Sequence, residues 1–173
     1  SLNRFTGRGV CCITTPITAP DMPAIKIYLA SASPRRRELL RQIGVAYRLL
    51  PVNIDETPLP GETPHTYVAR LAQAKAQSGI QTLGRRKPYP VLGADTAVVV
   101  DDVILGKPSN RQEGLAMLSL LSGREHQVLS AVALATATRD TVKVQESRVR
   151  FRELTAAECA AYWETGEPRD KAG

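Results

Sequence analysis

The sequence has few of the residues that build metal or disulfide frameworks. Three cysteines occur in 173 residues, Cys11, Cys12 and Cys159, and none of them stands in a C-x-x-C pair. With only His65 and His126 beside them, neither a zinc site nor a disulfide framework is indicated. Cysteines without a disulfide pattern are typical of a reducing compartment, so we expect the protein to be cytoplasmic.

Aromatic side chains and long apolar runs are also scarce. Aromatics make up 5% of the chain, so aliphatic side chains have to supply most of the core. No apolar run approaches the length of about 20 residues that a helix needs to cross a bilayer, and we expect no membrane partner. A composition of 43% hydrophobic and 23% charged residues is otherwise that of one ordinary globular domain.

The charge is unbalanced, with a formal net charge of +6. A basic protein attracts anionic partners, which can be nucleic acid, an acidic membrane surface or a phosphorylated small molecule. The sequence contains no helix-turn-helix, no RNA-binding aromatic motif and no stripe of interleaved lysines and aromatics. A phosphate-binding pocket therefore explains the charge better than a nucleic-acid groove, and no specific nucleic-acid partner is expected.

Regular patterning begins some way into the chain. Residues 1–21 have no continuous apolar segment and no clear periodicity, so we expect an N-terminal extension there and a single domain over 22–173. Strands alternate with helices in the first half of this domain and pair as hairpins in the second half. This order predicts an α/β fold in which a mixed, twisted sheet has flanking helices.

One predicted helix and one apolar stretch have distinctive residue patterns. A helix over 34–43 is expected to turn Leu39, Leu40 and Ile43 inward. The apolar stretch 91–100 is expected to be interrupted at Gly93–Thr96 and then to return as a hairpin at Asp101-Asp102. The remaining elements are predicted at these positions: strands at 26–30, 47–52, 103–105, 127–136 and 141–151, and helices at 64–78, 112–121 and 155–165, the last with a Thr155–Glu158 capping box.

A hydroxyl-rich turn followed by arginines is the first feature that could carry chemistry. Ser31-Ala32-Ser33 follows a predicted strand, and Pro34 opens a helix at a position where its missing N–H costs nothing. Free N–H groups at such a helix start bind anions, and Arg35 and Arg36 in the first turn lie nearest to them. The turn predicts a phosphate site, unless Ser33 is only an N-cap and the arginines are solvated.

Lys75 is the second feature. It follows Val68, Leu71 and Ala72 at helical spacing, so it lies on the apolar stripe of its helix. An ammonium in that position either extends along its stem to water or meets a charge partner. A triphosphate ligand would be such a partner.

Asp95 is the third feature, because it interrupts one of the most apolar stretches of the chain. An unpaired buried carboxylate is strongly destabilising, so this one should be paired, metal-bound or catalytic. Alternatively, Gly93 makes a turn that Asp95 merely caps. Lys107, in the loop after the predicted hairpin, is either close to this carboxylate or simply solvated.

These residues resemble the sequence blocks of Maf proteins, also known as septum-formation-inhibitor-like proteins. The opening block is Ser31-Ala32-Ser33-Pro34-Arg35-Arg36, followed by Glu38-Leu39-Leu40. The later blocks appear in the expected order: Ile54-Asp55-Glu56-Thr57, Leu71-Ala72-Gln73-Ala74-Lys75-Ala76, Gly93-Ala94-Asp95-Thr96, Gly106-Lys107-Pro108, Leu121-Ser122-Gly123-Arg124-Glu125-His126 and Gly166-Glu167-Pro168-Arg169-Asp170-Lys171-Ala172-Gly173. The likeness runs from about residue 25 to the last residue, and so many blocks in one order make chance agreement negligible.

The resemblance implies a fold related to the inosine triphosphate pyrophosphatases. It also implies hydrolysis of a nucleoside triphosphate to the monophosphate and pyrophosphate, with a divalent cation, Mg or Mn, as cofactor. Asp95 would accept the proton of the attacking water, and Glu56 and Asp95 would hold the metal, although the sequence leaves the division of these two roles open. The substrate-binding residues implied by the resemblance are Ser31, Arg35, Arg36, Lys75, Thr96 and Lys107.

Within the family, the chain looks like the branch that acts on dTTP and UTP. Ser33-Pro34-Arg35-Arg36 and Gly93-Ala94-Asp95-Thr96 carry this likeness, and Arg35 and Thr96 match positions associated with base selection. The sister branch acts on 7-methyl-GTP and tends to carry Gln in place of Thr96. The resemblance implies a house-cleaning role, in which modified pyrimidine nucleotides are removed before a polymerase uses them.

Other expectations follow from the same likeness. Family members continue beyond the block that ends at Gly173, so the resemblance implies a domain that lacks its C-terminal portion. We also expect a capacity to form a homodimer. The competing hypotheses are a non-enzymatic septation inhibitor or regulator that binds nucleic acid or a protein partner, and a nucleotide-binding module without turnover.

Overall fold

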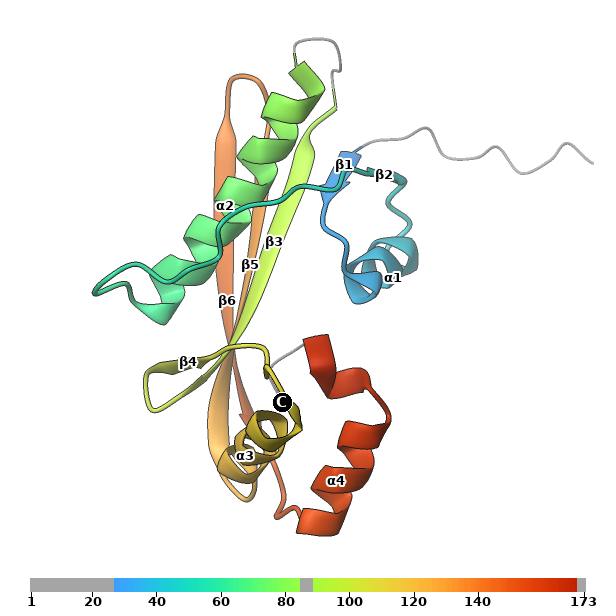
Figure 1. Ribbon diagram of the computed structural model, residues 1–173. Helices are drawn as coiled ribbons and strands as arrows, with labels where there is room; N and C mark the ends of the chain where they lie inside the picture. Colours follow the sequence, from blue (N-terminus) through green and yellow to red (C-terminus); the bar gives the residue numbers. More distant parts are fainter. Residues whose placement is uncertain (1–26, 85–88, 171–173) are drawn as a thin grey trace, which may run out of the picture.

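A computed structural model of the protein describes residues 27–84 and 89–170 (Figure 1). The predicted N-terminal extension, residues 1–21, lies outside the described residues. The described residues form six strands, four α-helices and a short 3-10 helix. In chain order these are β1 (Ile27–Ala30), α1 (Pro34–Gln42), β2 (Tyr47–Leu49), α2 (Pro64–Leu83), β3 (Val91–Val100), β4 (Val103–Leu105), α3 (Arg111–Leu121), β5 (Glu125–Ala135), β6 (Asp140–Arg150), α4 (Ala156–Glu164) and η2 (Glu167–Asp170).

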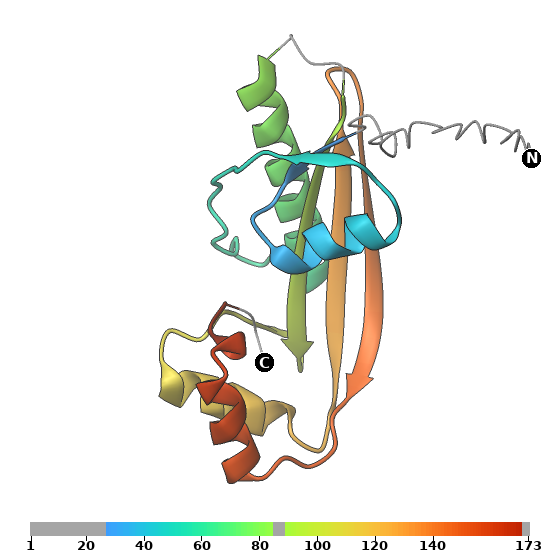
Figure 2. The ribbon, with the colours of Figure 1, turned by 90° about the vertical axis from the view of Figure 1, so that its right-hand side faces the viewer.

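The sheet is mixed, which confirms the predicted α/β fold. Its strand order is β2-β1-β3-β5-β6, and β4 pairs with the end of β3. β1 pairs in parallel with both β2 and β3, whereas β3, β4, β5 and β6 pair antiparallel. Helices α1 and α2 make the parallel connections and lie on opposite faces of the sheet (Figure 2). Residues that alternate along β3 therefore face different helices.

The core lies between α2 and the long strands. The buried residues of α2 are Val68, Leu71, Ala72, Ala76 and Gly79. Val68, Ala72 and Ala76 of this set form one buried cluster with residues of the sheet, which are Ala97, Val99, Leu129, Ala131, Ala133 and Ala135. Because so many of these side chains are small, the backbone of α2 approaches β3 closely.

That close approach overturns the predicted interruption at Gly93–Thr96. β3 runs unbroken from Val91 to Val100, and Gly93 pairs with Ala30 and Ala133 as an ordinary strand residue. A Cβ added at Gly93 would overlap the carbonyl oxygen of Ala72 and lie 2.6 Å from the backbone nitrogen of Ala76. Glycine is therefore required here by helix packing and not by a turn, and Asp95 caps nothing.

Two local predictions are confirmed, a hairpin turn and a capping box. The hairpin turn at Asp101-Asp102 has φ values of 49° and 63°, the left-handed values that a two-residue turn of this kind needs. Thr155 and Glu158 form the capping box of α4. Across residues 27–84 and 89–170, no helix combines the length and the apolar character that crossing a bilayer requires.

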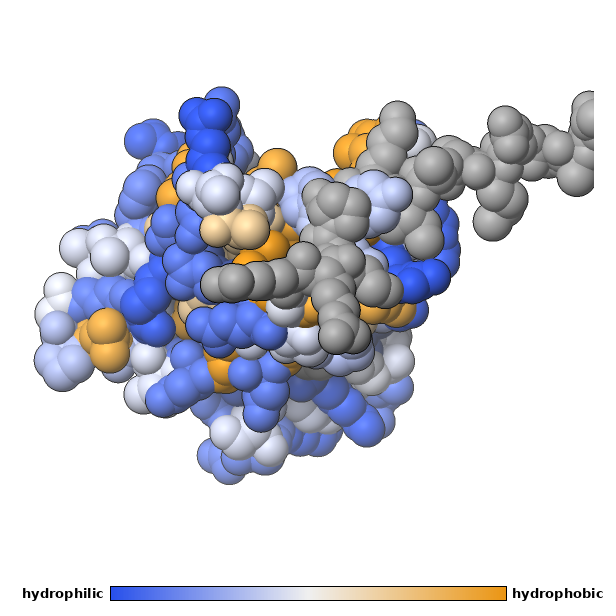
Figure 3. Space-filling view, turned by 90° about the horizontal axis from the view of Figure 1, so that it is seen from above, coloured by the Kyte–Doolittle hydropathy of each residue, from blue (hydrophilic) through white to orange (hydrophobic). Residues whose placement is uncertain are grey.

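The predicted inward face of α1 is wrong for two of its three residues. Leu40 is buried, but Leu39 is 43% exposed and Ile43 is 71% exposed. Helical spacing places these side chains near one another, yet burial requires a neighbouring element, and among the described residues none covers this part of α1. Figure 3, which shows the molecule from above, has exposed hydrophobic residues scattered among hydrophilic ones on that face.

Candidate active site

The centre of the site is an ammonium group between two carboxylates. Asp95 points from β3 toward α2 and is 8% exposed. Lys75, in the middle of α2, donates a hydrogen bond from Nζ to Asp95 Oδ1 at 2.7 Å, and the same nitrogen lies 2.7 Å from Glu56 Oε1. Lys75 thus has charge partners within the protein, and its position on the apolar stripe of α2 is explained by them.

Glu56 reaches this centre from the long loop between β2 and α2. Two side chains of α2 hold the backbone of that loop: the Tyr67 hydroxyl donates to the carbonyl oxygen of Glu56 at 2.9 Å, and Arg70 Nη2 donates to the carbonyl oxygen of Thr57 at 3.1 Å. Arg70 is itself fixed by hydrogen bonds of 2.6 and 2.7 Å to the carboxylate of Glu62. The loop is therefore anchored to the same helix that carries Lys75.

Tyr67, Arg70 and Glu62 were not predicted from the sequence as site residues. The first two fall on the partly buried side of α2, where an aromatic and an arginine carry no signal that distinguishes them from ordinary surface residues. Glu62 lies in a loop, eight positions before its partner. Only the path of the loop across α2 brings the three together.

The opposite face of β3 carries the second half of the site. Thr96 is on this face, and Arg36 from the first turn of α1 donates from Nη2 to Thr96 Oγ1 at 3.5 Å. Arg36 Nη1 also donates to Ser31 Oγ at 3.1 Å, and Ser31 Oγ accepts the backbone N–H of Ser33 at 3.2 Å. Ser33 occupies the N-cap position of α1 without a side-chain capping bond, so the start of this helix retains the anion-binding character predicted for it.

The two halves belong to one electrostatic cluster. Burial lowers the pKa of Arg36, and the carboxylates of Asp95 and Glu56 oppose that effect. The hydrogen bond from Lys75 holds the pKa of Glu56 below its usual value, assisted by the charges of Lys75, Lys107 and Arg36 and opposed by burial. Burial, followed by the charges of Asp95 and Glu56, raises the pKa of Tyr67. Two carboxylates and two cations from four separate segments therefore act on one another.

Two predicted substrate-binding residues stand apart from this cluster. The side chain of Arg35 is 69% exposed and pairs with Glu38 in its own helix at 3.3 Å. Lys107 is exposed in the loop after β4, and its charge acts on Glu56. Ser31, Arg36, Lys75, Thr96, Glu56 and Asp95 are brought together, whereas Arg35 and Lys107 lie at the margin.

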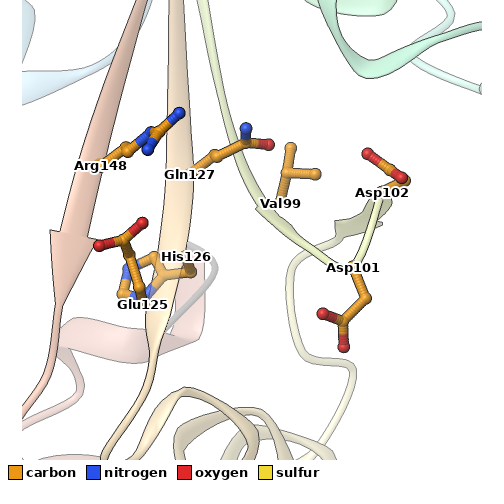
Figure 4. A pocket seen from close by; sticks show the side chains of 7 residues that line it. All are labelled: Val99, Asp101, Asp102, Glu125, His126, Gln127 and Arg148. Atoms are coloured by element: carbon orange, nitrogen blue, oxygen red, sulfur yellow. The ribbon is translucent and has the colours of Figure 1, made fainter.

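A separate cavity of about 250 Å³ lies at the far end of the sheet (Figure 4). It is lined by Val99, Asp101, Asp102, Glu125, His126, Gln127 and Arg148, and it shares no residue with the predicted site. Arg124 donates to both carboxylate oxygens of Asp101, at 2.7 and 2.8 Å, so this carboxylate already has a cationic partner.

Glu56 and Asp95 fit a divalent cation that binds together with a phosphate ligand. Within the described residues there is no group of three or more His, Cys, Asp or Glu side chains arranged to hold a metal ion by themselves. Mg²⁺ commonly takes one or two carboxylates and completes its shell with water and substrate phosphates. Two carboxylate oxygens that converge on one nitrogen provide such an incomplete set.

A mixed sheet that carries a buried carboxylate paired with a lysine on one face, and an arginine at a helix start on the other, defines an α/β protein suited to an anionic, phosphate-bearing ligand. Comparison with known families makes this specific. The chain belongs to the Maf-like protein family, whose model matches residues 26–173. The family likeness read from the sequence blocks is thereby confirmed.

Relatives with curated names match most of the chain. A dTTP/UTP pyrophosphatase from Photobacterium profundum is 45% identical over 156 residues, which cover 88% of this chain and 80% of the relative. One from Alkalilimnicola ehrlichii is 50% identical over 150 residues, covering 85% and 74%. Among solved structures, a nucleoside-triphosphatase / dITP/XTP pyrophosphatase from Mycobacterium abscessus has a TM-score of 0.47 at 20% identity, covering 71% of this chain and 72% of that one.

Proposed function

We propose that this protein is a nucleoside triphosphate pyrophosphatase that hydrolyses dTTP and UTP to the monophosphate and pyrophosphate. The observation that carries the proposal is the buried Asp95 carboxylate, held by Lys75 beside Glu56 and Arg36. The chain's relatives at 45–50% identity bear the name dTTP/UTP pyrophosphatase, which supports the same activity here. Removal of modified pyrimidine nucleotides from the nucleotide pool is the corresponding cellular role.

The triphosphate binds where negative charge is best accommodated. Backbone N–H groups at the start of α1, the hydroxyl of Ser31 and the guanidinium of Arg36 form one anion-binding surface. Lys75 adds positive charge on the other side of β3, and the charge of the exposed Lys107 acts on Glu56. Phosphoryl transfer depends mainly on positioning and charge neutralisation, so this arrangement supplies most of what the reaction requires.

Asp95 performs the proton transfer. Its carboxylate accepts a proton from the attacking water while a bond forms between the water oxygen and the α-phosphorus. The anhydride bond between the α- and β-phosphates breaks and its electron pair leaves with pyrophosphate, so the products are the monophosphate and pyrophosphate. Glu56 and Asp95 are the residues that would hold a divalent ion, Mg or Mn, which supplies further charge neutralisation when bound. Lys75 orients the Asp95 carboxylate through its hydrogen bond before substrate arrives.

Arg35 and Thr96 read the base. Thr96 already contacts Arg36 on the face of β3 that α1 overlies, and Arg35 lies one residue earlier on that helix. Arg35 has to leave Glu38 to do so, which costs little because an exposed ion pair contributes at most about 1 kcal/mol. A base with mismatched polar groups would leave buried donors or acceptors unpaired, and each costs about 1–3 kcal/mol.

A phosphate-release assay with added inorganic pyrophosphatase tests the proposal over a panel of nucleotides. The Photobacterium profundum relative, measured beside this chain, is the positive control for the assay. We expect dTTP and UTP to exceed GTP, CTP and 7-methyl-GTP by at least about tenfold in kcat/KM, equivalent to about 1.4 kcal/mol. Substitution of Arg35 or Thr96 should erode that ratio more than it lowers the best rate.

Two other results would contradict parts of this proposal. If 7-methyl-GTP were the best substrate, the pyrophosphatase activity would stand and the dTTP/UTP specificity would fall. If triphosphates bound without any turnover, the protein would be a nucleotide-binding module. No observation favours the non-enzymatic septation inhibitor or regulator. The cytoplasmic location and the homodimer stay predictions.

A further inference from the structure

Lys75 occupies the position that a divalent cation bound by Glu56 and Asp95 would need. Its Nζ lies 2.7 Å from Glu56 Oε1 and 2.7 Å from Asp95 Oδ1. Mg²⁺ binds carboxylate oxygens at about 2.0–2.1 Å, so an ion that bridges these two oxygens would fall in the space taken by the ammonium. An ion bound to both of these oxygens and the ammonium of Lys75 in its present place would therefore exclude each other.

The side chain of Lys75 is flexible, and one of its two carboxylate partners is half-exposed. Its Cα is fixed in the middle of α2, between the buried residues Leu71, Ala72 and Ala76. Its ammonium is carried on a flexible four-carbon stem, and it is bounded on one side by Asp95, whose side chain is 11% exposed, and on the other by Glu56, whose side chain is 48% exposed. The ammonium can thus move past Glu56 while the helix stays in place.

We propose that Lys75 is an exchangeable cation: in the nucleotide-free protein it fills the place of the metal between Glu56 and Asp95, and it yields that place when a substrate phosphate takes its charge. This inference rests on the proposed function, since the triphosphate is the anion that receives Lys75. Lys75 is then a positioning residue in the free protein and a substrate-binding residue in the complex.

The exchange couples metal binding to nucleotide binding. While Lys75 pairs with both carboxylates, the metal has to displace it, and the apparent metal affinity falls by the fraction of molecules in which the position is free. A triphosphate that draws Lys75 away raises the metal affinity, and the metal raises the triphosphate affinity by the same factor. A protein that works in this way avoids holding a metal ion without a substrate.

Mn²⁺ binding to the nucleotide-free protein, followed by electron paramagnetic resonance of free Mn²⁺, tests the proposal without any turnover. Lys75→Met removes the ammonium and keeps a side chain of similar length, and we expect Mn²⁺ to bind at least about tenfold more tightly than to the parent. Lys107→Met is the matched control, because it removes one positive charge that acts on Glu56 without contacting either carboxylate. It should change the affinity by less than about threefold, as screened charges at a distance do.

A second measurement uses the unaltered chain and does not depend on the folding of Lys75→Met. In the carbon-13 spectrum of lysine Cε groups, the Lys75 signal is assigned from its loss in Lys75→Arg. We expect saturation with Mg²⁺ to shift the Lys75 signal and to leave the Lys143 signal, from an exposed position on β6, unchanged.

The outcomes separate this inference from the proposed function. Mn²⁺ affinity that is equal or weaker in Lys75→Met, or a Lys75 signal that stays fixed at saturating Mg²⁺, would overturn the exchange whether or not the protein hydrolyses nucleotides. Tighter Mn²⁺ binding in Lys75→Met together with a complete lack of nucleotide turnover in the parent would uphold the exchange and reject the pyrophosphatase activity.

Discussion

At the scale of single residues, Asp95 shows how a costly group is accommodated. A carboxylate in the middle of β3 has lost most of its water, and removal from water is unfavourable unless a partner compensates. Lys75 supplies a direct hydrogen bond, and Arg36 contributes charge from the other helix. Lys75 and Arg36 thereby offset part of the cost of burying this carboxylate.

The first prediction concerns this carboxylate. Asp95→Asn keeps an oxygen that can accept the hydrogen bond from Lys75, but the amide cannot take a proton from water. We expect turnover to fall by about 10²–10⁴, the usual contribution of a general base, while triphosphate binding changes only a few-fold. Steady-state kinetics give the first quantity, and calorimetry with a non-hydrolysable triphosphate analogue gives the second.

Asp102→Asn is the matched control for Asp95→Asn. It makes the same chemical change in the β3–β4 turn, where φ is 63° and asparagine is well tolerated. It should leave turnover within about twofold of the parent, as surface changes away from a site generally do. Activity of Asp95→Asn within a few-fold of the parent would eliminate Asp95 as the base.

At the scale of elements, the packing of α2 on β3 fixes the distance between Lys75 and Asp95. Gly93 permits that distance, because a Cβ there would meet the backbone of Ala72 and Ala76. We predict that Gly93→Ala destabilises the protein by about 3 kcal/mol, since backbone atoms cannot move aside without displacing the whole helix. Urea unfolding measures the change.

Gly106→Ala provides the comparison for Gly93→Ala. No atom lies within 4 Å of a Cβ at Gly106, and its backbone is outside the left-handed region. We expect a change within about 0.5 kcal/mol, the range of ordinary surface substitutions. Equal stability of the two variants would show that the approach of α2 to β3 is looser than the structure has it.

The loop that carries Glu56 depends on the pair of Arg70 and Glu62. The hydrogen bonds from Arg70 lower the pKa of Glu62 to about 2, from 4.5 in an unfolded chain. A carboxyl whose pKa is lower in the folded state stabilises the protein above its unfolded pKa. That contribution is lost as the pH falls from about 4.5 through about 2.

We therefore predict a pH-dependent effect of Glu62→Gln. At neutral pH the variant should be less stable than the parent, because Arg70 loses its charged partner and the loop loses an anchor. The difference should shrink below about pH 4.5 and vanish as the pH falls below about 2, where the side chain of the parent becomes neutral as well. Urea unfolding of both proteins across this range checks the sign, and a constant difference at all pH values would contradict the ion-pair explanation.

At the scale of the whole molecule, we expect the net charge of +6 to serve a phosphate-binding pocket and not a nucleic-acid groove. We predict that duplex DNA binds weakly and without sequence preference, and that binding fades between 50 and 200 mM salt as counterion release requires. Fluorescence anisotropy with two unrelated duplexes measures both properties. Tight, sequence-selective binding at physiological salt would favour a regulatory role.

Local sequence determined the features that depend on neighbouring residues. The capping box of Thr155 and Glu158 and the Asp101-Asp102 turn were both predicted, because each is settled by backbone geometry and hydrogen bonds within a few positions. The alternation of strands and helices likewise predicted a mixed sheet. The sequence blocks identified the family, since their residues and their order can be read from the sequence without knowledge of the fold.

Only the tertiary structure decided which residues meet. From the sequence, Gly93 predicted a turn, because glycine is common in turns. The structure shows instead that glycine is needed for the close approach of α2, and residues next to Gly93 in sequence carry no signal of that contact. Leu39 and Ile43 follow a helical period that predicts burial, but burial depends on what covers the helix. Lys75 could have extended to water, and its pairing with Glu56 and Asp95 arises because a loop and a strand far apart in sequence converge on the same face of α2.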